Sequence, residues 1–407
     1  MYISNINKFL YFFFSLTIFV GLFVGEDSSG SGGFILDFKY TFPLIKDPLH
    51  PDTFGGLDMK FPLHYYIGSV IYSVLKNDFY LRFFYSVVSL ICPYIFYCCL
   101  KEKYKKIDLN FLFLFSLIIF MLPTFRSSAI WANTQITAII FFLISLYFFN
   151  KWENHKSINP NLLFMLLFLA FAVYTRQEYS LPYLYFVYYF YKELRFIEFI
   201  KTCSIIFLLA LPGLILIYFE PSLVPLYLNI DIFDSLLVNS SIMSFYLIPI
   251  FLITYLFSKK TKHINIKPYI ISSLISFIIV VFCALNFNYN FNMGGGFFLK
   301  ASLILFNSKY FFYLTSFLGL FFLYLLSLEK RNNLILSLIL LFGFSSYVIF
   351  QKYFEPMFLL LFFLVYKTEL TKNLLKRKMN IVLLQLYFLL YLAAAIMNQY
   401  FDITKSL

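Results

Sequence analysis

Apolar runs long enough to cross a bilayer recur from one end of this chain to the other, each of roughly 17–25 residues. The chain has 407 residues, of which 61% are hydrophobic and 13% are charged, and its mean hydropathy is +0.80. A soluble domain has about 25% charged and about 45–50% apolar residues. The composition therefore excludes a soluble globular protein and predicts an all-α polytopic membrane protein.

The apolar runs predict about 11–13 transmembrane helices in a single integral membrane domain, 1–407. The predicted spans lie near 6–24, 79–100, 109–125, 130–149, 161–175, 179–191, 202–219, 242–258, 268–286, 310–328, 334–350, 356–366 and 381–400. The 356–366 run is short for a bilayer, so either its ends reach further or it is partly re-entrant.

The net charge of +12 could indicate a nucleic-acid or acidic partner, but membrane topology explains it better. In the predicted helix order, 21 of the 32 Lys and Arg residues fall on one face with seven acidic residues. These basic residues are Lys8 and those of 101–106, 151–156, 192–201, 259–267, 330–331 and 367–378. The positive-inside rule places that face in the cytoplasm, together with the N-terminus. The first span lacks an A-x-A-like cleavage site and is interpreted as an uncleaved signal anchor.

The longest polar interval, 25–60, follows the first span on the extracytoplasmic side. It opens with Glu26 and Asp27, which precede a Gly/Ser run that could bring backbone N–H groups close to a phosphate. A flexible linker is an equally good interpretation of that run.

The rest of this first extracytoplasmic loop, taken as 25–78, has two further features. The segment 34–43 alternates aromatic and polar residues, and prolines then interrupt regular structure. The segment 61–76 is amphipathic and begins with a proline in its first turn, which predicts a short helix on the membrane surface.

Ionisable residues from distant parts of the sequence share the predicted extracytoplasmic face. They are Glu26, Asp27, Lys60, His64, Arg126, Arg176, Glu178, Lys352 and Glu355. Charged groups at bilayer depth are expensive and usually mark function or ion pairing. A carboxylate could accept the proton of an attacking hydroxyl, and cations could stabilise a phosphate leaving group. The pattern favours group transfer with an anionic leaving group.

The chain resembles the GT-C glycosyltransferases, membrane enzymes that use polyprenyl-phosphate sugars on the outer or lumenal face. The resemblance lies in the acidic pair of GEDSSGSGG after the first span, in FPLHYY (Phe61–Tyr66) and in QKYFEP (Gln351–Pro356). TRQ (Thr175–Gln177) is similar to the Arg-Gln pair of dolichyl-phosphate-glucose-dependent α-1,2-glucosyltransferases. Family members often have Asp-Glu where this chain has Glu-Asp, and larger members have a soluble C-terminal domain.

The resemblance implies direct displacement at the anomeric carbon with inversion. Asp27 is the first choice for the base and Glu26 the second. The residues implied in holding the donor phosphate are Arg126, Arg176, Lys352 and His64. Other candidate site residues, without an assigned role, are Gln177, Glu178, Lys60 and Glu355. No nucleotide-binding glycine fingerprint is present, in keeping with a lipid-linked donor.

The sequence does not indicate a cofactor. Some GT-C relatives hold a divalent metal through carboxylates, but no second acidic pair supports one here. The five cysteines show no CxxC or Cys/His spacing typical of a metal site and are interpreted as buried free thiols.

Two other function classes remain open. A flippase or transporter of lipid-linked glycans should carry charges in a central cavity, whereas here they gather at one face. An O-antigen-type polymerase or ligase usually has its large outer loop late in the chain, whereas here it comes first. The expected partners are a polyprenyl-phosphate sugar, a glycan, lipid or protein acceptor, and the bilayer. We expect a bacterial inner membrane, with the endoplasmic reticulum as the alternative.

Overall fold

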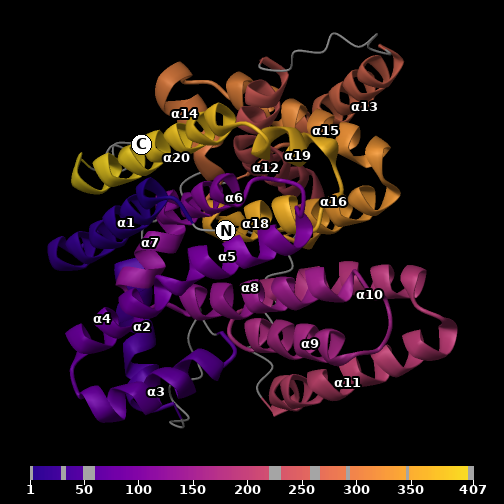
Figure 1. Cartoon of the computed structure of the whole chain (residues 1–407). Coiled ribbons are helices and arrows are strands. Elements are labelled where there is room, and N and C mark those ends of the chain that lie inside the picture. The colour runs from indigo at the N-terminus through magenta and orange to yellow at the C-terminus, as the bar shows by residue number, and fades with distance from the viewer. Residues whose placement is uncertain are drawn as a thin grey trace. The chain divides into compact units, whose positions relative to one another are not determined.

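The chain folds into two compact units, Met1–Leu226 and Tyr227–Leu407. The structure, a computed structural model, describes residues 3–28, 34–48, 60–219, 231–256, 266–289, 294–344 and 348–401. Every regular element within these ranges is a helix, which confirms the all-α fold class (Figure 1). The division into two compact units does not test whether residues 1–407 form a single membrane domain, which stays a prediction.

The first unit consists of eleven α-helices and short 3-10 segments in its described residues. The helices are α1 (Asn5–Val24), α2 (Phe34–Lys46), α3 (Leu63–Leu75), α4 (Asp78–Ser89), α5 (Ile91–Lys103), α6 (Leu109–Ser116), α7 (Pro123–Ile130), α8 (Thr134–Trp152), α9 (Pro160–Val173), α10 (Ser180–Glu193) and α11 (Phe196–Phe219). Side-chain caps set several of the starts: Ser4 accepts a hydrogen bond from Asn7 N–H before α1, and Asn77 accepts two before α4.

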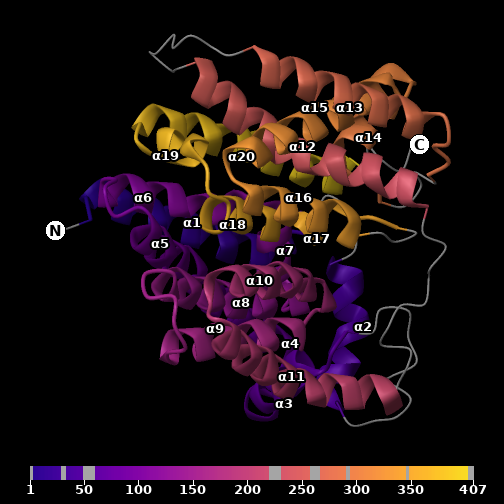
Figure 2. The ribbon, with the colours of Figure 1, turned by 90° about the vertical axis from the view of Figure 1, so that its right-hand side faces the viewer.

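Helix α8 is the centre of this unit and packs along α9 on one side and α5 on another (Figures 1 and 2). Its side chains are mostly buried, whereas only Thr202 and Gly213 of α11 are buried. An apolar helix that protein does not cover is suited to contact with lipid. The short helices α2 and α3 pack against each other beside this layer.

The second unit consists of nine α-helices in its described residues. They are α12 (Ile232–Leu256), α13 (Lys267–Ala284), α14 (Gly296–Phe306), α15 (Tyr310–Glu329), α16 (Arg331–Gly343), α17 (Gln351–Phe354), α18 (Met357–Leu364), α19 (Glu369–Leu375) and α20 (Lys378–Phe401). Helix α12 packs along α15, and Gly319 of α15 permits the closest approach. A Cβ at Gly319 would lie 2.0 Å from the carbonyl oxygen of Ser240.

Eight helices in the described residues are long and apolar enough to cross a membrane. A ninth arises if 109–121 and 123–130, which meet at a 67° bend, form one broken span. This confirms a membrane protein with several candidate spans, while the count of 11–13 stays a prediction. The shortfall lies in helices such as α9 and α10, which have 14 residues each.

The predicted 356–366 span is represented by α18, which has only eight residues, all of them buried. Its sequence is MFLLLFFL, and protein covers all eight side chains. An apolar run surrounded by protein has the same composition as one surrounded by lipid, so hydropathy alone could not separate them.

The first predicted extracytoplasmic loop contains more helix than expected. The alternating segment 34–43 lies within α2, which continues through Pro43 to Lys46, so the expected interruption at this proline is wrong. The helix predicted at 61–76 is confirmed as α3, whereas its place on the membrane surface stays a prediction. The Gly/Ser run lies largely outside the described residues.

Candidate active site

The two acidic residues, Glu26 and Asp27, directly follow the C-cap of α1. Gly25 adopts a left-handed conformation with φ of 70°, and its N–H donates to Gly21 O. Glu26 N–H donates to the same carbonyl at 2.8 Å, which turns the chain back over the last turn of α1. A Cβ at Gly21 would lie 2.6 Å from Glu26 Oε2, so glycine gives the carboxylate its room.

Glu26 forms a buried ion pair with Arg126 of α7. Arg126 Nε donates to Glu26 Oε1 at 2.8 Å and Nη2 to Oε2 at 2.6 Å, a two-point contact that is among the strongest in proteins. Arg126 also donates to the hydroxyl and carbonyl oxygens of Thr17, and Ser28 donates to Glu26 Oε1. Residues Glu26 and Arg126 are 5% and 3% exposed. This geometry favours a structural role for Arg126 over the predicted phosphate contact.

Asp27 has a different environment from its neighbour. Ser127 Oγ donates to Asp27 Oδ1 at 2.7 Å, and Ile35 N–H donates to Oδ2 at 3.2 Å from the first turn of α2. Asp27 is half-buried, so of the two adjacent carboxylates it is the more accessible. These hydrogen bonds, one to each carboxylate oxygen, fix the orientation of the side chain.

The connection between α7 and α8 runs beside these residues. Trp131 Nε1 donates to Glu26 O at 2.9 Å, and the Arg82 guanidinium stacks 3.6 Å from the centre of the indole ring. Ala132 then has φ of 49°, an uncommon left-handed conformation for a residue with a Cβ. Asn133 follows and donates through Nδ2 to Phe34 O at 3.1 Å.

His64 of α3 is fully buried, and both of its ring nitrogens have partners in the first unit. Nε2 lies 3.0 Å from Ala132 O, which can only accept, so Nε2 carries the proton. Nδ1 then accepts from Thr137 Oγ1 at 2.8 Å. Burial and, to a smaller extent, the positive charge of Arg176 together lower the pKa of His64 to about 4, against the hydrogen bond to Ala132 O, which raises it. A neutral imidazole with both nitrogens occupied favours a structural role over the predicted phosphate contact.

Because of His64, we expect the free energy of unfolding to decrease as the pH falls from 6.5 to 4. The unfolded chain takes up this proton near pH 6.5 and the folded chain only near 4, so between them the unfolded state binds more protons. The loss is up to about 3 kcal/mol. Thermal unfolding of nanodisc-embedded protein across this range should show the slope. His64→Phe should reduce it and His155→Gln, at an exposed histidine, should not; equal slopes in all three proteins would contradict the prediction.

Arg176 belongs to a second group of charged residues. It is the N-cap residue of the 3-10 turn Gln177–Tyr179. Arg176 Nη2 and Nε donate to the two carboxylate oxygens of Glu178, and Arg176 is 3% exposed. Burial acts to raise the pKa of Glu178, but the charges of Arg176 and Lys60 outweigh it and hold that pKa at about 2. The carboxylate is therefore ionised throughout the physiological range. We call Lys60, Arg176 and Glu178 the Arg176 cluster.

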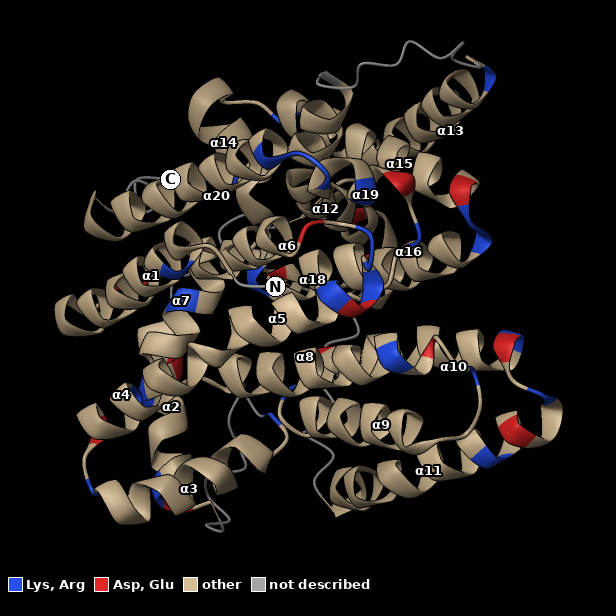
Figure 3. Ribbon diagram, in the orientation of Figure 1, with Lys and Arg blue, Asp and Glu red and all other residues tan. Residues whose placement is uncertain are grey.

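In the first unit, a series of contacts runs from the segment before Arg176 to the acidic pair. Tyr174 O, two residues before Arg176, accepts from Leu63 N–H at the start of α3. The next residue of α3, His64, contacts Ala132, which follows the tryptophan bound to Glu26 O. Most other charges of this unit lie elsewhere, at the ends of α5, α8, α10 and α11 (Figure 3).

The remaining two predicted residues, Lys352 and Glu355, lie in the second unit. Glu355 is completely buried and accepts from Tyr246 OH at 3.3 Å, and Gln351 Nε2 lies 3.4 Å from the same hydroxyl. Lys352 Nζ lies 5.2 Å from the centre of the Phe350 ring. A common site for these residues and Asp27 stays a prediction.

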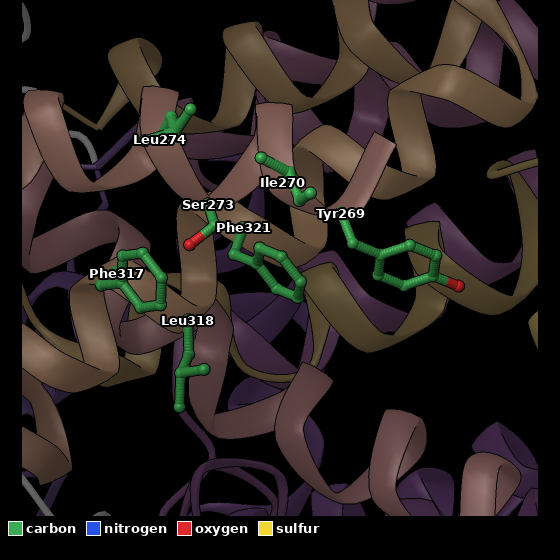
Figure 4. Close-up of a pocket in the computed structure, with 7 residues that line it drawn as sticks. All are labelled: Tyr269, Ile270, Ser273, Leu274, Phe317, Leu318 and Phe321. Atoms are coloured by element: carbon green, nitrogen blue, oxygen red, sulfur yellow. The ribbon is translucent and has the colours of Figure 1, made fainter. Parts of the chain in front are cut away.

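An apolar groove in the second unit lies between α13 and α15 and has a volume of about 490 Å³ (Figure 4). Its lining includes Leu274, Phe317 and Phe321, and its side-chain polar groups are the hydroxyls of Tyr269 and Ser273. A groove without charged side chains is suited to hydrocarbon and offers no acid–base chemistry. No group of three His, Cys, Asp or Glu residues in the described part of the chain is placed to hold a metal.

The structure thus brings together Glu26, Asp27 and Arg126, and it pairs Arg176 with Glu178. Sequence reasoning missed the groups that orient them, above all Ser127, Trp131 and Asn133. The sequence gives one indication of these residues, which is that Ser127 directly follows Arg126 in PTFRSS. A hydroxyl, an indole and an amide are too common to indicate a site without the fold.

Comparisons with protein families, with curated proteins and with solved structures give no match to this chain. The residues of the site itself therefore have to support any functional proposal.

Proposed function

We propose that this protein is a glycosyltransferase that moves a sugar from a polyprenyl-phosphate donor to an acceptor hydroxyl. The main support is the environment of Asp27, a half-buried carboxylate held by Ser127 Oγ and Ile35 N–H at the end of a candidate membrane span. A fixed, accessible carboxylate at such a place can take a proton from a substrate hydroxyl. The adjacent Glu26 is engaged with Arg126, which favours Asp27 over Glu26 as the base.

In the proposed reaction, Asp27 accepts the proton of the acceptor hydroxyl as its oxygen attacks the anomeric carbon. A new carbon–oxygen bond forms while the bond from that carbon to the phosphate oxygen breaks. The polyprenyl phosphate leaves with the bonding electron pair, and the configuration at the anomeric carbon inverts. No outside oxidant or reductant is required.

The leaving phosphate needs positive charge close by. Arg176 and Lys60 are the candidates in the first unit, where their combined charge already lowers the pKa of Glu178. Lys352 of the second unit is kept as a further candidate from the sequence. The proposed phosphate site is centred on the Arg176 cluster because it has two cations and one carboxylate, whereas the charge of Arg126 is matched by Glu26.

The proposal includes a topology of 11–13 spans in a bacterial inner membrane. The N-terminus and the lysine-rich loops would lie in the cytoplasm, and Asp27 on the extracytoplasmic face. The apolar surface of helices such as α11 supports a bilayer environment.

The direct test is transfer by the purified protein in nanodiscs, supplied with radiolabelled polyprenyl-phosphate hexoses or pentoses and a cell-envelope extract as acceptor. The expected result is labelled acceptor together with released polyprenyl phosphate. Unchanged donor in every combination would contradict the proposal. Movement of intact donor across the membrane of a proteoliposome would instead favour a flippase.

A further inference from the structure

Asn133 has a buried acceptor that the structure leaves unused. The residue is 2% exposed, and its Oδ1 atom has no hydrogen-bond partner within the described part of the chain. Leaving a buried polar atom unpaired costs about 1–3 kcal/mol, so such atoms are rare in folded proteins. Other buried side-chain N and O atoms of the described residues, including both amide atoms of Asn150, are also unpaired, so Asn133 is singled out by its connection to the peptide group that Asp27 also contacts.

The orientation of the amide is fixed by its other end. Nδ2 donates to Phe34 O at 3.1 Å, and exchanging the two amide atoms would place two acceptors against each other. The backbone N–H of Asn133 donates to Ser128 O at 3.1 Å, directly after the left-handed Ala132. Oδ1 is therefore the atom that stays available.

Asn133 and Asp27 hold the same peptide group. Phe34 O accepts from Asn133, and Ile35 N–H, on the opposite edge of that planar unit, donates to Asp27 Oδ2. Asn133 and the proposed base thus lie on opposite edges of one peptide group. A neutral amide here also adds no negative charge beside Glu26 and Asp27.

We propose that Asn133 Oδ1 binds a hydroxyl group of the sugar substrate next to Asp27. This inference rests on the proposed glycosyltransferase function and assigns a residue that fixes the sugar while Asp27 takes a proton. A hydroxyl is the ligand chemistry that fits, because Oδ1 can only accept a hydrogen bond. Oδ1 is enclosed, so the surrounding side chains move to admit the sugar.

The experiment compares donors that each lack one hydroxyl. Citronellyl-phosphate hexoses are used as probes, in the parent form that the wild-type protein transfers and in the 2-, 3-, 4- and 6-deoxy forms. We expect one deoxy donor to lower kcat/KM of the wild type by about tenfold or more, chiefly through KM. In Asn133→Ala the same deoxygenation should have almost no further effect, because its partner is already gone.

Two variants separate recognition of the sugar from folding. Asn133→Asp keeps an acceptor oxygen but loses the donor to Phe34, so it should retain the deoxy penalty even if its stability falls. Asn150→Ala removes another buried asparagine of the same unit, whose two amide atoms also have no partner in the described residues. This control should discriminate between donors as the wild type does.

The outcomes distinguish this inference from the proposed function. Transfer by the wild type with the same deoxy penalties in Asn133→Ala would overturn the inference and leave the function standing. A loss of transfer activity in Asn133→Ala that is equal for every donor would also overturn the inference. Absence of transfer by the wild type with every parent donor would overturn the proposed function, and this inference with it.

Discussion

Asp27→Asn should lower the rate of sugar transfer by about 10²- to 10⁴-fold, the usual contribution of a general base. The amide has nearly the shape of the carboxylate but cannot accept the proton of the attacking hydroxyl. Its oxygen can still accept from Ser127 Oγ, so the fold should survive. The measurement is single-turnover transfer from a polyprenyl-phosphate sugar, with thermal unfolding measured on the same sample.

The matched control is Asp47→Asn, the same chemical change at an exposed position just beyond α2. It should leave transfer within a factor of about two of the wild type, because an exposed side chain outside the site has little effect. Full activity in Asp27→Asn would remove Asp27 as the base, and full activity in Glu26→Gln as well would remove the acidic pair from the chemistry.

The membrane class of this protein could be predicted because it depends on composition, which needs no tertiary information. Long helices such as α1 and α12 follow directly from runs of apolar residues. The predicted spans that begin at 6 and 79 start within one residue of α1 and α4, whose starts are set locally by the caps Ser4 and Asn77. These features are determined within a few neighbouring residues.

The burial of α18 could not be predicted in the same way. Helix α18 reads as a membrane span by composition, yet its eight residues are all covered by protein. Whether an apolar helix meets lipid or other helices depends on its neighbours, and those come from distant parts of the chain. Hydropathy alone therefore could not decide whether the runs of α9, α10 and α18 cross the membrane.

The site shows the same division between local and distant information. Glu26 and Asp27 are adjacent and chemically alike, and the sequence could not assign their roles. Their partners at Arg126 and Ser127 lie 100 residues away, and these contacts make one carboxylate buried and paired and the other accessible. The contribution of Asn133 depends on an atom that lacks a partner, which no sequence pattern reveals.

Glu26→Gln and Arg126→Gln should each destabilise the protein by about 3–5 kcal/mol, because each leaves a buried charge without its counter-charge. The double variant should recover part of that loss, since it leaves neither charge. The control is Glu193→Gln, which breaks the partly exposed Lys156–Glu193 pair and should cost at most about 1 kcal/mol.

Unfolding of the four variants in nanodiscs would measure these differences, and single variants as stable as the wild type would contradict a structural role for the pair. The comparison with Asp27→Asn then separates the two carboxylates. Loss of activity at Glu26 should accompany loss of stability, whereas at Asp27 the activity should fall while the fold remains. That contrast follows from the different environments of the two carboxylates, because Glu26 is buried and paired with Arg126 whereas Asp27 is only half-buried.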